Sequence, residues 1–172
     1  MKEHVKFSVD EVRSIMKELV TALVFLKNLG VLHGSIIEQN MLYNRKTGHM
    51  KLINFAFSEP REGWNQDNSV QAKSSDSASR FFDYRPEVLD REMKDIENIS
   101  YFLLLILTLE RPYKDTFNHL EGFTKGFRDR LEDPESQSAV DAADLMATLF
   151  GYGSYQITSM EVILTHSFFT RQ

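Results

Sequence analysis

The sequence of 172 residues contains no cysteine, one tryptophan and four prolines. Without cysteine there are no disulfides, thiolate nucleophiles or cysteine-ligated zinc sites, which fits a reducing compartment. The longest apolar run, residues 101–107, is far shorter than the roughly 20 residues of a membrane span, and the N-terminal stretch lacks the apolar core of a signal peptide. We therefore expect an intracellular protein, cytoplasmic or nuclear, with no membrane partner.

Runs of basic residues are also absent, because the 20 Lys and Arg residues are scattered among 25 Asp and Glu residues, for a net charge of -5. Electrostatics therefore indicate no nucleic-acid partner. Most of the histidines are dispersed without ligand spacing, so we expect no metal site. These are His4, His49, His119 and His166. The length and the 42% hydrophobic content predict a single domain, residues 1–172, with a substantial core.

The first half of the chain predicts one helix and one hairpin. Ser8 and Glu11 form a capping box, apolar residues recur at helical spacing as far as Leu26, and Gly30 ends the helix. Two β-rich runs, MLYN and HMKLINF, then flank the turn sequence RKTG, which predicts a hairpin.

The second half predicts a polar loop followed by helices. Residues 61–80 are polar and contain the candidate phosphorylation sites Ser74, Ser75, Ser77 and Ser79. Residues 95–110 are apolar on every face after Asp95, a candidate N-cap, and this pattern predicts a central buried helix. Further helices are predicted near 117–131, 138–150 and 159–166. The fold class is therefore mainly α (α+β), with a small β-hairpin at one edge.

Several short motifs follow one another in a specific order. VLHGSIIEQNML contains His33 and Asn40, and KLINFAFSEP follows it. YRPEVL, DIENISYFLLLILTLERPY and ITSMEVILTHSFF come later in the chain. In this order and spacing they resemble the C-terminal lobe of the eukaryotic protein kinase fold, over residues 7–169. The polar loop then matches the activation segment. The glycine-rich loop and strand lysine of the N-terminal lobe have no counterpart before the first helix, so we expect the N-lobe to be absent.

The resemblance implies which residues would have chemical roles. His33, Ser35 and Asn40 occupy the catalytic-loop positions, where a kinase has an aspartate in place of Ser35. A serine hydroxyl without an adjacent activator cannot serve as the base near neutral pH. Gly34 replaces the arginine of the motif, and Ile37 replaces the lysine that would meet the transferred phosphoryl group. We therefore expect these catalytic positions to be degenerate.

The metal motif is degenerate in the same way. Asn54, Phe55 and Ala56 occupy the Asp-Phe-Gly positions, and an amide at position 54 brings no negative charge for a hard dication. Asn40 alone does not hold Mg²⁺. We therefore expect no cofactor, neither ATP nor Mg²⁺.

The resemblance also implies structural roles. His33 should pack against Phe55, and Asp95 should bind the backbone of the catalytic loop. Glu87 matches the glutamate of the Ala-Pro-Glu motif, which pairs with an arginine in the family, but Gln156 stands at the matching position. That ion pair is expected to be lost or replaced by a hydrogen bond.

Three interpretations of function follow. The first is a catalytically inactive, pseudokinase-like domain that acts as a protein-interaction or regulatory module. Its protein partner would bind the exposed surface that faces the N-lobe, around the hairpin and Phe55. The alternative is the C-terminal part of an unusual or truncated serine/threonine kinase, with Glu38 as the substitute acid. A third is a degenerate gene product with no selected role. The serine cluster is either solvated loop or a phosphorylation site that needs an arginine partner such as Arg80 or Arg85.

Overall fold

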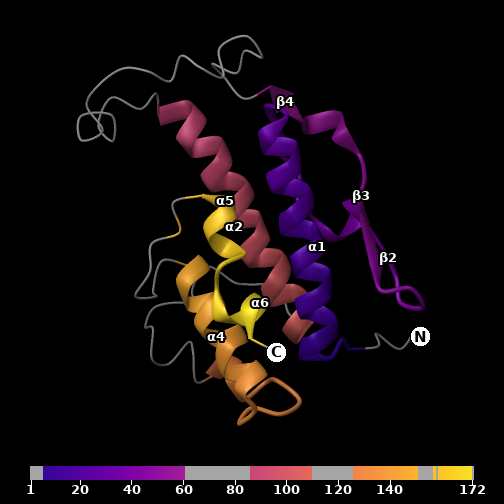
Figure 1. Ribbon diagram of the computed structural model, residues 1–172, viewed down its shortest axis with the longest axis vertical. Coiled ribbons are helices and arrows are strands. Elements are labelled where there is room, and N and C mark those ends of the chain that lie inside the picture. Colours follow the sequence, from indigo (N-terminus) through magenta and orange to yellow (C-terminus); the bar gives the residue numbers. More distant parts are fainter. Residues whose placement is uncertain (1–5, 61–85, 110–125, 151–156, 158, 172) are drawn as a thin grey trace.

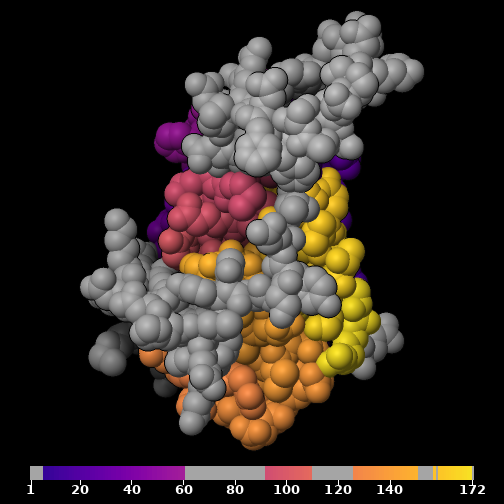
Figure 2. Space-filling view, turned by 90° about the vertical axis from the view of Figure 1, so that its left-hand side faces the viewer, coloured from indigo at the N-terminus to yellow at the C-terminus, as the bar shows by residue number. Residues whose placement is uncertain are grey.

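The computed structural model describes residues 6–60, 86–109, 126–150, 157 and 159–171. Two long helices, α1 (Val9–Asn28) and α2 (Pro86–Thr108), run side by side through its centre (Figure 1). Further along the described part of the chain, α4 (Gln137–Leu149), α5 (Met160–Ile163) and α6 (Ser167–Thr170) pack against them. The strands lie along the other side of α1 (Figure 1). In the space-filling view of Figure 2 the segments of α2, α4 and α5–α6 adjoin on one face.

The first helix forms as its sequence predicts. The hydroxyl of Ser8 accepts a hydrogen bond from the backbone N–H of Glu11 (3.2 Å), and the Ser8 N–H donates to the Glu11 carboxylate (3.0 Å). Gly30, with φ of 77°, follows the C-cap residue Leu29 and supplies the left-handed conformation that ends many helices. The capping box and the glycine stop are therefore confirmed.

The central helix begins earlier than predicted. α2 starts at Pro86, so Asp95 lies in its third turn and is not its N-cap; that prediction was wrong. Residues 86–94 include several good helix formers after an initial proline, a residue favoured in the first helical position, so the helix continues into the apolar segment without a break. The prediction that this segment is buried is confirmed for most of its apolar residues: Ile99, Phe102, Leu103, Leu104, Ile106 and Leu107.

Two pairs of short strands surround the loop of residues 33–40. β2 (Met41–Asn44) and β3 (His49–Leu52) form the predicted antiparallel hairpin, in which Met41 faces Leu52 and Asn44 faces His49. β1 (Val31–Leu32) pairs antiparallel with β4 (Glu59–Pro60). This second pair was not predicted, because two-residue strands carry no periodic signal. The β1–β4 pair thus adjoins the start of the loop, and the β2–β3 hairpin follows its end.

In the C-terminal region, the last predicted helix is shorter in the structure than the sequence predicts. α4 begins one residue before the predicted helix near 138–150. Within the range 159–166, where one helix was predicted, the structure has only the single turn α5. A second turn, α6, follows after its N-cap residue His166, whose ring accepts from the backbone N–H of Phe168 (3.2 Å). Most of the helix predicted near 117–131, and the whole loop of residues 61–80, lie outside the described residues.

A buried ion cluster connects three of the helices. Lys27, near the end of α1, places its Nζ 2.6 Å from Glu92 of α2 and 2.8 Å from Glu161 of α5. Glu92 also accepts from the backbone N–H of Met160 (3.4 Å). Lys27 and Glu92 are both buried within a core built from α1, α2 and α4. The charged cluster therefore fixes α5 against the two central helices.

Candidate functional site

The loop of residues 33–40 begins with His33, whose side chain is completely buried. The backbone N–H of Ser35 donates to Nδ1 (3.3 Å), so the ring hydrogen is on Nε2, which donates to the carbonyl of Ile53 (3.2 Å). Burial lowers the pKa of this imidazole. The ring packs edge to face against Phe55, with centroids 5.0 Å apart. A neutral imidazole with both nitrogens engaged serves the shape of the loop.

A carboxylate from α2 binds the backbone of the same loop. Asp95 is 1% exposed, and its Oδ2 accepts from the backbone N–H of His33 (3.2 Å). The backbone N–H of Gly34 donates to Oδ1 (3.1 Å) and lies 3.4 Å from Oδ2. Burial raises the pKa of Asp95 to about 6, the negative charge of Glu92 adds to the increase, and the two N–H donors act in the opposite direction. The contact that the resemblance implied is present.

The two asparagines of the motifs are hydrogen-bonded to each other. The Asn40 amide Nδ2 donates to the carbonyl and the hydroxyl oxygen of Ser35, both at 2.9 Å. Its Oδ1 accepts from Nδ2 of Asn54, at 3.0 Å. Asn54 adopts a left-handed backbone conformation with φ of 65°, which asparagine tolerates better than most residues. Ser35, Asn40 and Asn54 thus form one connected polar group, although 14 residues separate the two amides.

The residues after Asn54 lie against this loop. Phe55–Phe57 forms a single turn of 3-10 helix, in which the N–H of Ser58 donates to the Phe55 carbonyl (3.1 Å). The Ser58 hydroxyl donates to the carbonyl of His33 (3.2 Å), and the pairing of β4 with β1 follows directly. The segment is therefore bonded to the loop on both sides of its turn.

Large apolar side chains are exposed on the outer side of this region. Phe57 is 67% and Phe55 is 49% exposed, and Ile37 and Leu42 are exposed as well. We call these four residues the apolar rim. They come from the loop, from the hairpin strand β2 and from the 3-10 turn. Leu42 of the hairpin and Phe55 are therefore both exposed in the region where the sequence analysis expected apolar surface, and a partner there stays a prediction.

Other predicted residues cannot be compared with the structure. Gln156 and the serines at 74, 75, 77 and 79 lie outside the described residues, and Glu87 lies in α2 at a position whose side chain is not described. Glu38 is half-buried and accepts a hydrogen bond from Gln39 (3.2 Å). Within the described ranges, no group of three or more His, Asp or Glu side chains is arranged to hold a metal ion.

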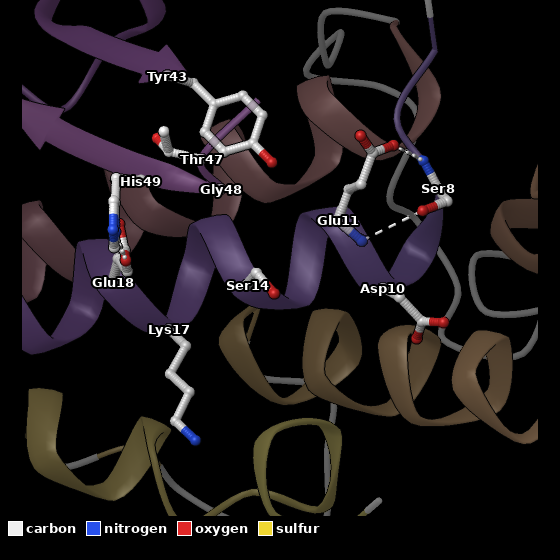
Figure 3. A pocket seen from close by; sticks show the side chains of 10 residues that line it. All are labelled: Ser8, Asp10, Glu11, Ser14, Lys17, Glu18, Tyr43, Thr47, Gly48 and His49. Carbon is white, nitrogen blue, oxygen red and sulfur yellow. Dashed lines mark hydrogen bonds and ion pairs between the residues drawn. The ribbon is translucent and has the colours of Figure 1, made fainter. Parts of the chain in front are cut away.

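A groove that the sequence analysis did not predict lies between α1 and the hairpin (Figure 3). Its volume is about 570 Å³, and Tyr43 and His49 face α1 across it. Its acidic side chains have partners: Glu18 bonds His49 (3.0 Å), and Glu11 bonds Arg45 (2.8 Å), which lowers the pKa of Glu11. These two ion pairs connect the hairpin to α1. They could not have been predicted from helical spacing alone.

The chain has a protein kinase-like fold. The solved structure of the Cydia pomonella granulovirus kinase PK-1 superposes with a TM-score of 0.62 at 18% sequence identity, over 98% of this chain and 61% of that one. No protein-family model matches the chain.

Two curated proteins are similar in sequence. The serine/threonine-protein kinase 1 of Heliothis zea nuclear polyhedrosis virus is 25% identical over 185 residues, which cover 98% of this chain and 62% of that protein. The probable serine/threonine-protein kinase ndrC of Dictyostelium discoideum is 33% identical over 78 residues, 43% of this chain and 6% of that protein. The chain therefore spans less than two thirds of the length of these relatives. None of the described helices is long and apolar enough to cross a membrane.

Proposed function

We propose that this chain is a catalytically inactive, pseudokinase-like domain that acts through protein contacts at the apolar rim. The observation that carries the proposal is the hydrogen bond from Asn54 Nδ2 to Asn40 Oδ1. In the kinase mechanism an aspartate and an asparagine at these positions present oxygens to Mg²⁺. Here a neutral amide directs an N–H toward the oxygen that would be the second ligand, so the pair satisfies itself without a cation.

The remaining catalytic positions support the same proposal. The Ser35 hydroxyl accepts from Asn40, and no carboxylate stands at that position to act as a base. Ile37 is apolar and exposed at the position where the resemblance implies a phosphate-binding lysine. Both losses remove charge that phosphoryl transfer requires, since that reaction is catalysed mainly by positioning and charge neutralisation.

Thermal denaturation with and without Mg²⁺ and ATP tests the loss of nucleotide binding. We expect no saturable increase in the melting temperature with ATP, Mg²⁺ or both together, and no autophosphorylation with radiolabelled ATP. The double variant Ser35→Asp, Asn54→Asp serves as the matched reference, because it restores the two acids. Saturable stabilisation of the wild type by Mg·ATP would overturn the proposal.

A protein partner at the rim is the second part of the proposal. Burying exposed apolar area is favourable, at about 25 cal/mol per Å², and rims of this kind mark interaction surfaces. The occupant would be another polypeptide with a complementary apolar face, either a separate protein or a further part of a longer natural chain. A photo-crosslinking residue at position 42 should capture it, and Phe57→Asp should abolish both the crosslink and saturable binding of the purified partner.

Val162→Asp is the control for this experiment, because Val162 is exposed on α5, on the other side of the molecule from the hairpin (Figure 1). It should leave capture unchanged. Equal capture by Phe57→Asp and the wild type would remove the rim from the proposal.

One observation favours a second candidate function, the C-terminal part of a serine/threonine kinase. The similarity to a viral protein of that name extends over 98% of this chain but only 62% of the relative. In this alternative a separate N-lobe supplies the nucleotide site, and Glu38 supplies the acid. Mg·ATP-dependent phosphotransfer that Glu38→Gln abolishes would establish it in place of the first proposal.

A further inference from the structure

Gly34 follows His33 at the position where the resemblance implies an arginine. Its φ is +75°, and a Cβ added to it would lie 2.5 Å from the carbonyl oxygen of Phe57 and 3.4 Å from the carbonyl carbon. Cβ atoms are essentially never found as close as 2.5 Å to another heavy atom, and this neighbour is backbone, which cannot move aside as the end of a flexible side chain can. Only glycine therefore allows this approach between the loop and the segment that follows Asn54.

The surroundings of Gly34 leave it little freedom to adjust. On one side its N–H donates to Asp95, a buried carboxylate of α2. On the other side the Ser58 hydroxyl donates to the carbonyl of the preceding residue, His33, and β4 continues along β1. A side chain at position 34 would have to displace either the loop from Asp95 or the 3-10 turn from the loop.

We infer that Gly34 is a positioning residue for the apolar rim: by lacking a side chain it allows the Phe57 carbonyl to lie against the loop, and this contact fixes Phe55 and Phe57 in one arrangement. The inference rests on the proposed function for the use of the rim, whereas the contact itself exists without any partner.

The chain contains a matched control for this inference. Gly48, in the hairpin turn, has φ of +71°, but a Cβ added there would meet no atom within 4 Å. Gly34→Ala and Gly48→Ala therefore impose the same kind of backbone strain, and only the first adds a collision. The difference between the two variants isolates the contact with Phe57.

Native-state amide hydrogen exchange on the isolated chain is the test. In Gly34→Ala the Ser58 and Glu59 amides should exchange at least about tenfold faster than in the wild type, while α4 keeps its protection. Gly48→Ala should leave Ser58 and Glu59 unchanged. Equal exchange in the two alanine variants would overturn the inference.

Ser58→Ala keeps the test decisive if Gly34→Ala does not fold. It removes only the hydroxyl that bonds to the His33 carbonyl, and we expect exchange of the Ser58-position and Glu59 amides to accelerate about threefold or more. No acceleration there would show that the segment is held without the loop contact, against the inference. None of these measurements involves a partner, so failure of the proposed interaction, seen with Phe57→Asp, stays distinguishable from failure of this one.

Discussion

The inner and outer sides of the loop of residues 33–40 are composed in opposite ways. The inner side buries the polar residues His33, Asn40 and Asp95 beside the apolar Ile36, and the polar side chains hydrogen-bond to backbone or amide groups of the loop. The outer side is apolar and exposed, with Phe57 as its most exposed member. Ordinary folding favours the reverse, because buried polar groups cost free energy unless they are bonded and exposed apolar groups gain nothing from water.

The buried polar residues on the inner side therefore stabilise the fold, whereas the exposed apolar residues on the outer side are available for binding. Each inner polar group described above has hydrogen-bond partners, so removing any one leaves others buried and unsatisfied. The rim residues leave much of their side-chain surface in contact with solvent. Substitutions on the inner side should therefore lower stability strongly, and substitutions on the outer side should act mainly on binding.

The largest effect is expected from the buried ion cluster. Lys27→Met keeps the length of the side chain but removes the cation that lies 2.6 Å from the buried Glu92, and we expect the free energy of unfolding to fall by about 3–5 kcal/mol in urea denaturation. The double variant Lys27→Met, Glu92→Gln should recover a large part of that loss, because it also removes the buried negative charge of Glu92. A loss in the single variant no larger than in the double variant would contradict the role of this pair.

The next effect tests the carboxylate beneath the loop. Asp95→Ala leaves the backbone N–H groups of His33 and Gly34 without an acceptor, and we expect a loss of about 3 kcal/mol in the free energy of unfolding. Glu97→Ala is the control on the same helix, since the Glu97 carboxylate lies at the surface beside Lys94. It should change stability by no more than about 0.5 kcal/mol. Similar losses in the two variants would mean that the loop does not depend on Asp95.

The pH dependence of stability should distinguish the two titratable groups of the inner side. The folded pKa of Asp95, about 6, lies above its ordinary value of 3.8, so the folded state binds more protons between these values. The contribution of Asp95 to the free energy of unfolding is therefore fully present below pH 4 and is lost as the pH rises through 6. The stability of the wild type relative to Asp95→Asn should therefore fall by up to about 3 kcal/mol between pH 4 and 7, measured by urea denaturation.

His33 should behave in the opposite sense. Burial lowers its pKa, so its contribution is present above the ordinary value of 6.5 and is lost as the pH falls through the folded value. The advantage of the wild type over His33→Gln should consequently grow as the pH rises over the same range. If the stability differences between the wild type and the two variants did not change between pH 4 and 7, neither Asp95 nor His33 would titrate differently in the folded and unfolded chains.

Local signals were enough to predict α1 and the hairpin. The capping box at Ser8 and Glu11, and the turn sequence between β2 and β3, act between residues close in the chain, so they work before the rest of the fold exists. The same helical spacing that runs through Leu19 and Leu23 continues to Lys27 and would have placed it on the buried face. Because a lysine is rarely buried without a partner, its charge argued against placing it on the buried face.

Longer-range contacts explain what could not be predicted. Local sequence alone indicated Asp95 as a helix N-cap, because aspartate is favourable there, and only the family resemblance predicted that its carboxylate oxygens accept from a loop 61 and 62 residues away. The bond between Asn40 and Asn54 depends on the length of the hairpin between them. The motifs predicted the contact of His33 with Phe55, whereas the contact of Gly34 with the Phe57 carbonyl was visible only in the structure.

The smallest effect on stability, and the sharpest contrast, is expected at the rim. Phe57→Ser should change the free energy of unfolding by no more than about 0.5 kcal/mol, since a side chain that is 67% exposed buries little area on folding. Phe25→Ser on α1, at 62% exposure, is the control of matched residue type. His33→Ala, which removes a buried ring, should cost about 3 kcal/mol. A large loss of unfolding free energy in Phe57→Ser would show that the aromatic side chain stabilises the fold. Its exposure would then not indicate a binding partner. A small loss in stability together with the loss of crosslinking from position 42 would mean that an apolar residue of little use to the isolated fold contributes to recognition instead.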